Sequence, residues 1–448
     1  MASNDPSPAG PAAVRALEAK SVTDPVAHFF ARLGIHYAWV VAAVTFLTAL
    51  VSAGALGSVG VLLLPVEIEF GWTPAEVSSA LGLRLALFGL TAPFAAALFN
   101  RFGLRPVILV SLAMITAGMG LSVFVKEIWH LVALWGVVVG IGAGLTAIVL
   151  SATVATRWFE KRRGLVVGML AASTATGQLV VLPALAWVVD RTGWRAAILV
   201  MCGLYALASV LVIIFIRNCP SDVGLKPFGA DDAFQPQPAP TGNLFAMPFA
   251  ALGEAVRKPM FWVLAGAFFI CGASTNGLVQ MHLIPMCADY SITATSAAGL
   301  LALMGIFDFF GTIASGWLSD RFNSRVLLFW YYGLRGLSLL YLPFSNFGSV
   351  ELAVFAVFYG LDWIATVPPT VKLTAQTFGP ARANLVFGWI FAAHQLGAGF
   401  AALMAGIIRT ELGSYSLAFQ GAGLLCVVAA LAVLASNGRK REPVTAAA

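Results

Sequence analysis

Four ionisable side chains lie inside long apolar runs in the C-terminal half of this sequence. Asp308 stands in "LALMGIFDFFGTIASGW", and Arg335, Asp362 and His394 lie one in each of the next three runs. A charge at the centre of a bilayer costs at least ~2.5 kcal/mol, so it persists where it is paired or has a function. If each run is a helix, Asp308 lies roughly 16 Å and Arg335 roughly 15 Å from the same side of the membrane. Asp362 and His394 come to a similar depth, so we expect the four groups to share one plane.

These residue types could bind a proton and an anion. Asp and His titrate when desolvation and neighbouring charges shift their pKa, so we assign proton coupling to Asp308, His394 and Asp362. A guanidinium presents a planar fork that suits a carboxylate. Arg335, and Arg84 in "LGLRLALFGL", are therefore candidate substrate-binding residues.

Each of these residues also has a structural interpretation. Asp308 and Arg335 could form an ion pair that joins two helices, and we predict this pairing from their matched depth. His394 could be a neutral, hydrogen-bonded interior residue, and Arg84 could extend its charged end to the membrane surface. Asp362 could cap a helix that is broken by the two prolines of "YGLDWIATVPPT". For that reason we favour His394 over Asp362 as the proton site.

The composition is that of a membrane protein. The 448 residues are 60% hydrophobic and 10% charged, and the mean hydropathy is +0.89, which excludes an ordinary soluble protein. An open sheet cannot satisfy its backbone in lipid and barrel-type alternation is absent, so we predict an all-α protein of twelve transmembrane helices. The twelve apolar runs that are long enough to cross a bilayer lie near residues 37–64, 76–99, 106–125, 129–153, 164–189, 195–216, 259–286, 295–318, 326–345, 350–372, 383–408 and 414–436.

The net charge of +6 indicates topology rather than a nucleic-acid partner. Of the 26 Lys and Arg residues, twenty fall on one side of the predicted membrane, four fall on the other side, and two lie inside runs. By the positive-inside rule, both termini and segment 217–258 are cytoplasmic. We expect a multi-pass protein of the cell (inner) membrane and no nucleic-acid partner.

The chain repeats itself at an offset of 220 residues. The offset aligns residues in several parts of the sequence, among them Arg101 with Arg321, Arg105 with Arg325, Arg162 with Arg382 and Gly193 with Gly413. A polar segment rich in Pro, Asp and Gln separates the runs six and six. We therefore predict two pseudo-symmetric six-helix halves with a linker and two cytoplasmic tails, in the order 1–35 (tail), 36–216 (first half), 217–258 (linker), 259–436 (second half) and 437–448 (tail).

One loop motif resembles the signature of the major facilitator superfamily. "GWLSDRFNSR" (316–325) contains a Gly, an Asp-Arg pair and a further Arg, and "AALFNRFGLR" (96–105) is a copy in which Ala96 and Asn100 replace the Gly and the Asp. The resemblance covers all twelve runs and implies two halves that rock about a central site. It also implies a cytoplasmic latch formed by Asp320, Arg321, Arg325, Arg101 and Arg105, with a solvated loop as the alternative interpretation of Asp320.

Two further stretches are similar to the monocarboxylate and oxalate/formate branch of that superfamily. They are "RWFEKRRGLVVGM" (157–169) and "RNCPSDVGLKPFG" (217–229). In that branch an Asp and an Arg one helical turn apart are functional. Asp308 matches the Asp, whereas Thr312 occupies the Arg position, so Arg335 would have to supply the guanidinium.

Three polar residues lie on helices that line the central cavity in this superfamily. Asn276 and His282 belong to "CGASTNGLVQMHLIP", and Gln178 belongs to "TATGQLVVLP". We expect them to bind substrate, with hydrogen bonding between helices as the alternative.

No catalytic, metal or nucleotide site is expected. The five cysteines are scattered without metal-like spacing, and "GIGAGL" (140–145) lies inside an apolar run with no strand before it. We therefore expect no enzyme activity, no cofactor and no metal.

Together these features predict a secondary active transporter, a proton-coupled carrier of small organic anions such as monocarboxylates. Its partners would be the anion, protons and the lipid bilayer, and we expect a monomer that works by alternating access. A proton-driven exporter of hydrophobic compounds stays open because the Phe-rich "FWVLAGAFFI" could line an apolar cavity. A non-transporting membrane sensor of the same fold is the alternative of another class, although such a sensor would typically carry a folded soluble extension.

Overall fold

The computed structural model of the chain describes residues 24–146, 148–231 and 246–436. These residues form helices, and the only bridge between extended segments among them joins Phe159 to Phe228. The all-α prediction is confirmed for this part of the chain. Residues 1–23, 232–245 and 437–448, which belong to the predicted tails and linker, lie outside the described residues.

The helices before residue 216 form one group, the N-terminal bundle. Local sequence signals set their ends: α4 begins with a capping box, in which the Thr73 hydroxyl accepts from the Glu76 N–H and the Glu76 carboxylate accepts from the Thr73 N–H. The elements are α2 (Pro25–Arg32), α3 (Tyr37–Phe70), α4 (Pro74–Phe102), α5 (Leu104–Leu121), η1 (Ser122–Phe124), α6 (Ile128–Leu131), η2 (Val132–Val139), α7 (Gly140–Leu145), α8 (Ile148–Trp158), α9 (Arg163–Thr192) and α10 (Trp194–Phe215).

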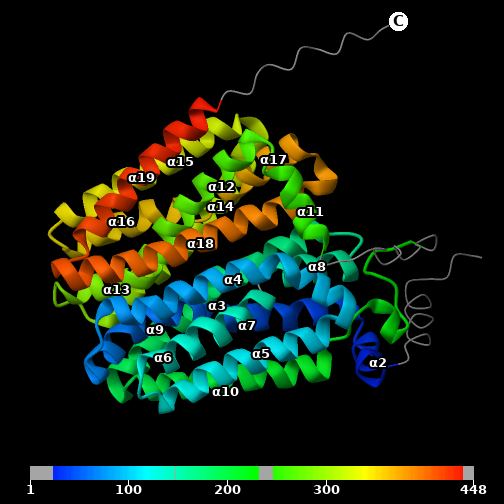
Figure 1. Cartoon of the computed structure of the whole chain (residues 1–448). Coiled ribbons are helices and arrows are strands. Elements are labelled where there is room, and N and C mark those ends of the chain that lie inside the picture. Colours follow the sequence, from blue (N-terminus) through cyan, green and yellow to red (C-terminus); the bar gives the residue numbers. More distant parts are fainter. Residues whose placement is uncertain (1–23, 147, 232–245, 437–448) are drawn as a thin grey trace, which may run out of the picture.

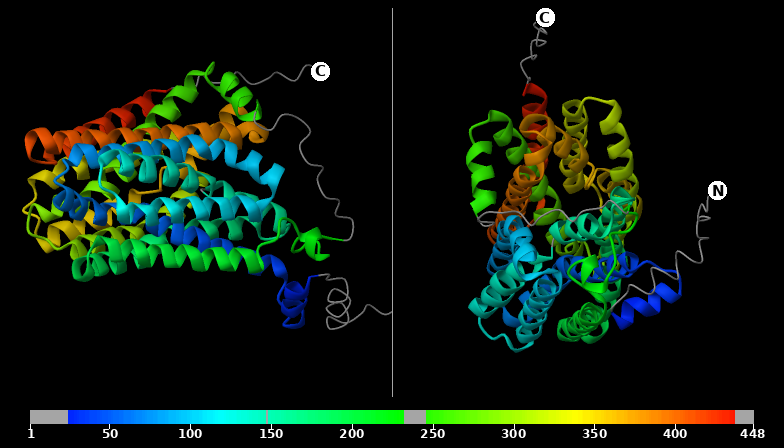
Figure 2. Two further views of the ribbon diagram at one scale, coloured as in Figure 1. Left: turned by 60° about the horizontal axis from the view of Figure 1, so that its bottom comes forward. Right: turned by 90° about the vertical axis from the view of Figure 1, so that its right-hand side faces the viewer.

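The later helices form the C-terminal bundle, which the short η3 (Pro220–Val223) precedes. Figure 1 and the right-hand view of Figure 2 show this bundle above the N-terminal bundle. Its elements are α11 (Ala246–Ala255), α12 (Pro259–Gly272), η4 (Ala273–Val279), α13 (Gln280–Ala288), α14 (Ala294–Arg321), α15 (Ser324–Tyr341), η5 (Leu342–Phe344), α16 (Ser349–Asp362), α17 (Val367–Phe378), α18 (Pro380–Leu412) and α19 (Ser416–Ala435).

Ten helices or helix series in the described ranges are long and apolar enough to cross a membrane. Each of the twelve predicted runs coincides with one helix or one series, but α9 and α15 are not among the ten. In α15 the two arginines, Arg325 and Arg335, lower the apolar character of an 18-residue helix. The protein is therefore a multi-pass membrane protein, and the number of twelve crossings stays a prediction.

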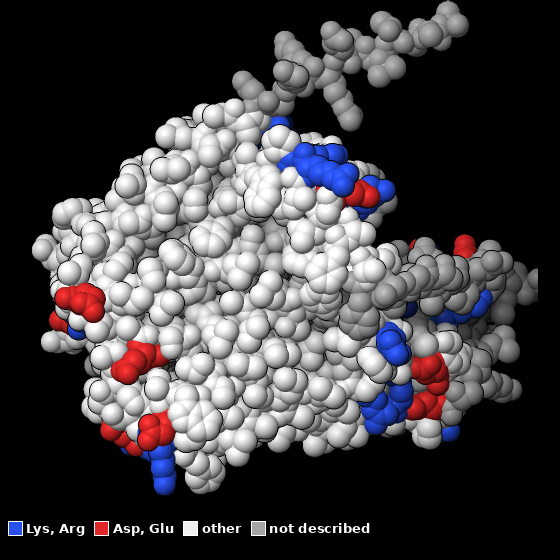
Figure 3. Space-filling model, in the orientation of Figure 1, with Lys and Arg blue, Asp and Glu red and all other residues white. Residues whose placement is uncertain are grey.

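The two bundles share two ends. We call the end that carries α2, α11 and the start of the 217–231 segment the proximal end, and the end that carries the short connections 71–73, 289–293 and 413–415 the distal end. Lys and Arg side chains gather at the proximal end, and Asp and Glu are prominent at the distal end (Figure 3). The basic residues that the sequence places on one side of the membrane thus lie mainly at one end of the fold.

The bundles meet along three helix pairs: α4 with α18, α9 with α14, and α3 with α13. Within the C-terminal bundle, α12 and η4 pack against α18 so closely that a side chain would not fit. A Cβ atom added at Gly277 would lie 2.2 Å from the Ala398 carbonyl oxygen, whereas one added at Gly299 would meet nothing within 4 Å. Small residues permit this approach of membrane helices.

We expect Gly277→Ala to destabilise the purified protein by about 1–3 kcal/mol, because the methyl group must push η4 away from α18. Gly299→Ala is the matched control, since it adds the same methyl group in open space. Thermal unfolding in detergent measures both variants. Equal melting temperatures for the two would contradict the close contact.

Candidate functional site

The site is built around a break in a membrane helix. α16 ends at Asp362 and α17 begins at Val367, with four turn residues between them. Prolines at positions 368 and 369 cause the break, because proline has no N–H and disfavours helical backbone in the residue before it. In an apolar environment the backbone groups freed by such a break need other partners.

Arg335 of α15 supplies partners for the end of α16. Its Nη2 donates to the backbone oxygens of Asp362 (2.5 Å) and Trp363 (3.1 Å), and its Nε donates to Asp362 Oδ2 at 2.7 Å. The Arg335 side chain is fully enclosed, and Asp362 is 6% exposed. The guanidinium therefore pairs with a carboxylate and also closes the carbonyl end of a helix, where a positive charge is favoured.

Two residues of α14 hold the rest of the turn. Asp308 Oδ1 accepts from the Ile364 N–H (2.9 Å) and from the Thr312 hydroxyl (3.0 Å). The Ser315 hydroxyl donates to the Ala365 carbonyl at 2.5 Å. Side chains of two neighbouring helices thus satisfy the backbone of the broken segment.

The predicted ion pair between Asp308 and Arg335 is wrong. Arg335 pairs with Asp362, and Asp308 instead binds the backbone of the turn. The reason is the break itself, which brings a carboxylate and two free carbonyls to the guanidinium at the same place. The alternative that Asp362 caps a broken helix is partly right, because Asp362 ends α16, but the capping group is Arg335.

A thiol and an imidazole complete the cluster. Arg335 Nη1 donates to Cys271 Sγ at 2.9 Å, and Cys271 lies 3.3 Å from the Thr366 hydroxyl. His394 lies beside Cys271 and between two aromatic rings, with ring centroids 5.1 Å from Phe268 and 5.8 Å from Phe391. The sequence analysis missed Cys271, although its place in the run before Asn276 gives it a similar depth.

The cluster has two carboxyl groups and one guanidinium. It contains the carboxyl groups of Asp308 and Asp362 and the single guanidinium of Arg335, and Asp362 Oδ1 and His394 Nδ1 are buried without hydrogen-bond partners in the part of the chain that the structure describes. An uncompensated charge in a dry interior is costly. A proton on one of the carboxyl groups would remove that cost.

The other predicted substrate-binding residues lie elsewhere. Arg84 is 2% exposed in α4, packs against Gly140 and lies within electrostatic range of Tyr205 in the N-terminal bundle, so it does not extend to the surface.

His282 Nε2 donates to the Ala402 carbonyl at 3.0 Å, which joins α13 to α18 and fits the structural alternative. Asn276 is partly exposed on η4. Gln178 lies on α9, and its side chain is outside the described residues.

The predicted latch residues do not form one charged cluster among the described side chains. Arg101 and Arg321 each lie over a neighbouring ring, with the guanidinium carbon 5.5 Å from the Phe102 centroid and 4.0 Å from the Trp317 centroid. The backbone N–H groups of Arg105 and Arg325 bind the side chains of Asn218 and Asn323. The Asp320 side chain is outside the described residues.

A residue that the motif analysis missed joins the proximal ends of α4 and α8. Arg157 Nη2 donates to Asn100 Oδ1 at 2.6 Å and to the Phe99 carbonyl at 3.2 Å, and Nη1 donates to the Asn218 carbonyl. Asn100 thus accepts from an arginine although it replaces the acidic residue of the motif. The signal in the sequence was the Arg at the start of "RWFEKRRGLVVGM".

Comparisons with known proteins agree with this architecture. The family model described as Major Facilitator Superfamily matches residues 41–371 and 283–447. The chain is 27% identical to monocarboxylate transporter 13 of Rattus norvegicus over 393 residues, which cover 86% of each protein. It is 26% identical to monocarboxylate transporter 11 of Mus musculus over 397 residues, with 86% of this chain and 83% of that protein covered. It is also 26% identical to the oxalate:formate antiporter of Oxalobacter formigenes, over 78% of this chain and 79% of that protein. The resemblance predicted from the loop motifs is confirmed.

We expect Arg335→Gln to cost about 3–5 kcal/mol of stability, because it leaves Asp362 and the carbonyls of α16 without their donor. Asp362→Asn should cost less, since the guanidinium keeps its two backbone acceptors and the amide oxygen can still accept. In the double variant the loss should be smaller than the sum of the two single losses.

Thermal unfolding of the purified variants in detergent tests this order. Arg321→Gln is the control, because the contacts of this exposed arginine with the described residues stay within its own helix turn, and surface changes of this kind stay within about 0.5 kcal/mol. Strictly additive losses, or a larger loss in Asp362→Asn than in Arg335→Gln, would contradict the described contacts.

Proposed function

The chain belongs to the major facilitator superfamily of transporters, and from this premise we propose that it is a proton-coupled carrier of small organic anions. The premise also means that the chain is not an enzyme. Relatives that are named monocarboxylate transporters and an oxalate:formate antiporter support carboxylates as the substrate class. We further propose that all twelve helical runs cross the membrane as two pseudo-symmetric halves, and that the basic proximal end faces the cytoplasm.

The observation that carries the proposal is the buried pair of Arg335 and Asp362. While Asp362 is ionised, it neutralises the guanidinium. A proton on Asp362 removes that negative charge, and the guanidinium can then attract the carboxylate of a substrate. Proton and anion therefore bind together, which is the requirement for their coupled movement.

The hydrogen bonds of Arg335 favour a mechanism in which a substrate carboxylate replaces Asp362 Oδ2, rather than one in which the substrate binds beside it. Four of its bonds go to Asp362 Oδ2, two backbone oxygens and Cys271 Sγ, and a guanidinium has five N–H groups. An incoming carboxylate could accept from the second N–H of Nη1 and from the Nε–H that now donates to Asp362 Oδ2. This geometry supports Asp362, rather than His394, as the residue that carries the coupled proton.

The remaining members of the cluster have supporting roles in this proposal. Asp308 holds the Ile364 N–H and so keeps the turn in place, and its carboxyl group is a second position for a proton. His394 is a neighbouring proton acceptor that lies beside Cys271. We propose no cofactor and no metal, and the carrier would act as a monomer by rocking of the two bundles.

Uptake by proteoliposomes tests the function. We expect the wild-type protein to accumulate at least one labelled carboxylate from a panel that includes oxalate and formate, and to do so when the outside is more acidic. Failure to move any carboxylate would contradict the substrate class. It would favour the exporter of hydrophobic compounds instead.

Asp362→Asn should reduce gradient-driven accumulation by tenfold or more, because the amide cannot deliver a proton. Exchange of labelled for unlabelled substrate should survive, since exchange requires only that the loaded carrier reorient. Glu351→Gln, in the first turn of the same helix α16, is the control that should behave like wild type. Uphill accumulation that persists in both Asp362→Asn and His394→Gln would remove these two residues from the coupling step.

A further inference from the structure

The two bundles are in direct contact at their distal ends, along a surface that we call the distal seam. The Ala75 N–H of α4 donates to the Thr410 hydroxyl of α18 at 3.1 Å, and the Thr295 hydroxyl of α14 donates to Asp190 Oδ2 of α9 at 2.5 Å. At Gly60 of α3, an added Cβ would lie 2.8 Å from the Gln280 carbonyl oxygen. These contacts close the distal end in this conformation.

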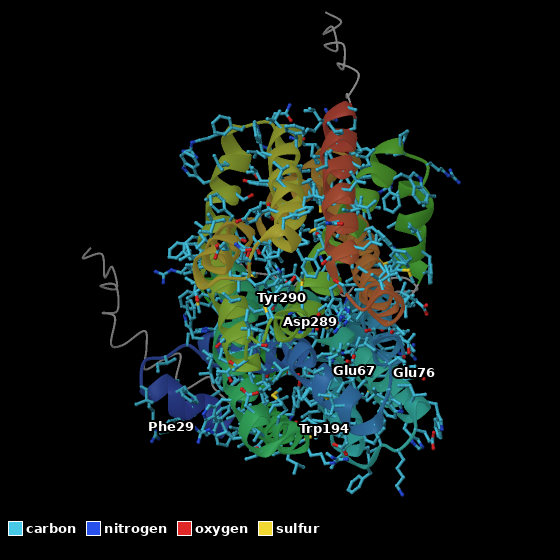
Figure 4. All side chains as sticks on the ribbon, turned by 90° about the vertical axis from the view of Figure 1, so that its left-hand side faces the viewer. Phe29, Glu67, Glu76, Trp194, Asp289 and Tyr290 are labelled. Carbon is cyan, nitrogen blue, oxygen red and sulfur yellow. The ribbon has the colours of Figure 1, made fainter. Side chains whose placement is uncertain are left out.

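Glu67 of α3 lies in the distal seam, and one oxygen of its carboxyl group lacks a hydrogen-bond partner among the described residues. This oxygen, Oε1, is buried. Three groups of the other bundle act on it electrostatically: Asp289 after α13, Arg409 of α18, and Tyr415 before α19. Figure 4 looks onto this end and shows Glu67 near Asp289, with Glu76 on the far side of Glu67 from Asp289.

The one cation in this group already has a partner. Arg409 Nη2 donates to Asp289 Oδ1 at 2.6 Å, and its guanidinium lies over the Tyr415 ring at 5.4 Å. Burial raises the pKa of Asp289, and the charge of Arg409 and its hydrogen bond to Asp289 oppose that rise. Arg195 and Trp194 of the N-terminal bundle both bind Glu69, two residues from Glu67, so Arg195 already has a carboxylate partner.

A cavity lies beside this place. It has a volume of about 330 Å³ and is lined by residues that include Asp289, Tyr290, Arg409 and Tyr415. All three groups that act on Glu67 therefore border this cavity, which is the route that we propose for protons to reach the seam.

We infer that Glu67 is a proton-binding residue that links closure of the distal seam to the pH on the distal side. A carboxylate with one oxygen buried and unbonded, beside a second carboxylate whose arginine is already paired, is costly, and a proton on Glu67 removes that cost. When the bundles separate at this end, Glu67 returns to water and releases the proton. The inference rests on the proposed rocking of the two bundles, but it holds for any substrate.

The sign of the pH effect follows from this difference in bound protons. The closed seam holds one proton more than the open seam, so acid favours closure. Between the pKa values of Glu67 in the two conformations, the ratio of closed to open molecules should rise about tenfold for each unit that the pH falls.

Pulsed electron paramagnetic resonance on spin labels at Thr192→Cys and Val350→Cys measures the seam directly. Both positions are exposed at the distal end, one on each bundle, and the half-buried Cys202 and Cys219 are replaced by alanine to avoid labelling them. The measurement uses the full chain in lipid nanodiscs without substrate, so it is independent of the uptake assay. We expect the short-distance population to grow as the pH falls.

Glu67→Gln should keep the seam closed at every pH, because the amide needs no proton. Asp289→Asn should weaken the pH dependence, since it frees Arg409 for Glu67. Glu76→Gln is the matched control: Glu76 is an exposed carboxylate at the same end, and its variant should keep the wild-type pH dependence. Distances that do not change with pH in the wild type, or an unchanged pH dependence in Glu67→Gln, would overturn the inference.

Discussion

A broken helix in an apolar environment needs side chains to replace its missing backbone bonds, and the C-terminal bundle depends on this requirement. The break at residues 363–366 frees carbonyl groups and an N–H that need partners in an apolar environment. Arg335, Asp308 and Ser315 supply the missing partners from two other helices. The same contacts join α14 and α15 to the turn after α16, so the polar cluster has a structural role in addition to any role in transport.

This double duty explains how a buried ion pair can serve transport. Removing one member of such a pair strands a charge, whereas a proton on the acid changes the partner of the guanidinium without emptying its backbone bonds. The carbonyls of Asp362 and Trp363 keep Arg335 in place while its bond to the Asp362 carboxylate is exchanged. We propose that the backbone bonds keep the site in shape, while the bond to the Asp362 carboxylate is free to change with its charge.

The sequence was sufficient for the helical runs and for the depth of the buried charges, because both follow from length and rise per residue. Asp308, Arg335, Asp362 and His394 do gather in one region. It was not sufficient for the pairing, since the partner of Arg335 depends on how the chain turns between α16 and α17. The role of Arg157 as the partner of Asn100 could not be read from the motif either, because it depends on the approach of α8 to α4. For the same reason Glu67 was not singled out, as only the meeting of α3 with the C-terminal bundle isolates its carboxyl group.

The central claim is that protonation of Asp362 makes Arg335 available to an anion. Isothermal titration calorimetry of a transported carboxylate into the purified protein, repeated in buffers of different ionisation enthalpy, counts the protons taken up when the anion binds. The account predicts uptake of about one proton per bound anion at a pH where Asp362 is ionised in the free protein, and no uptake in Asp362→Asn. Anion binding without proton uptake in the wild type, or with the same uptake in Asp362→Asn, would contradict it.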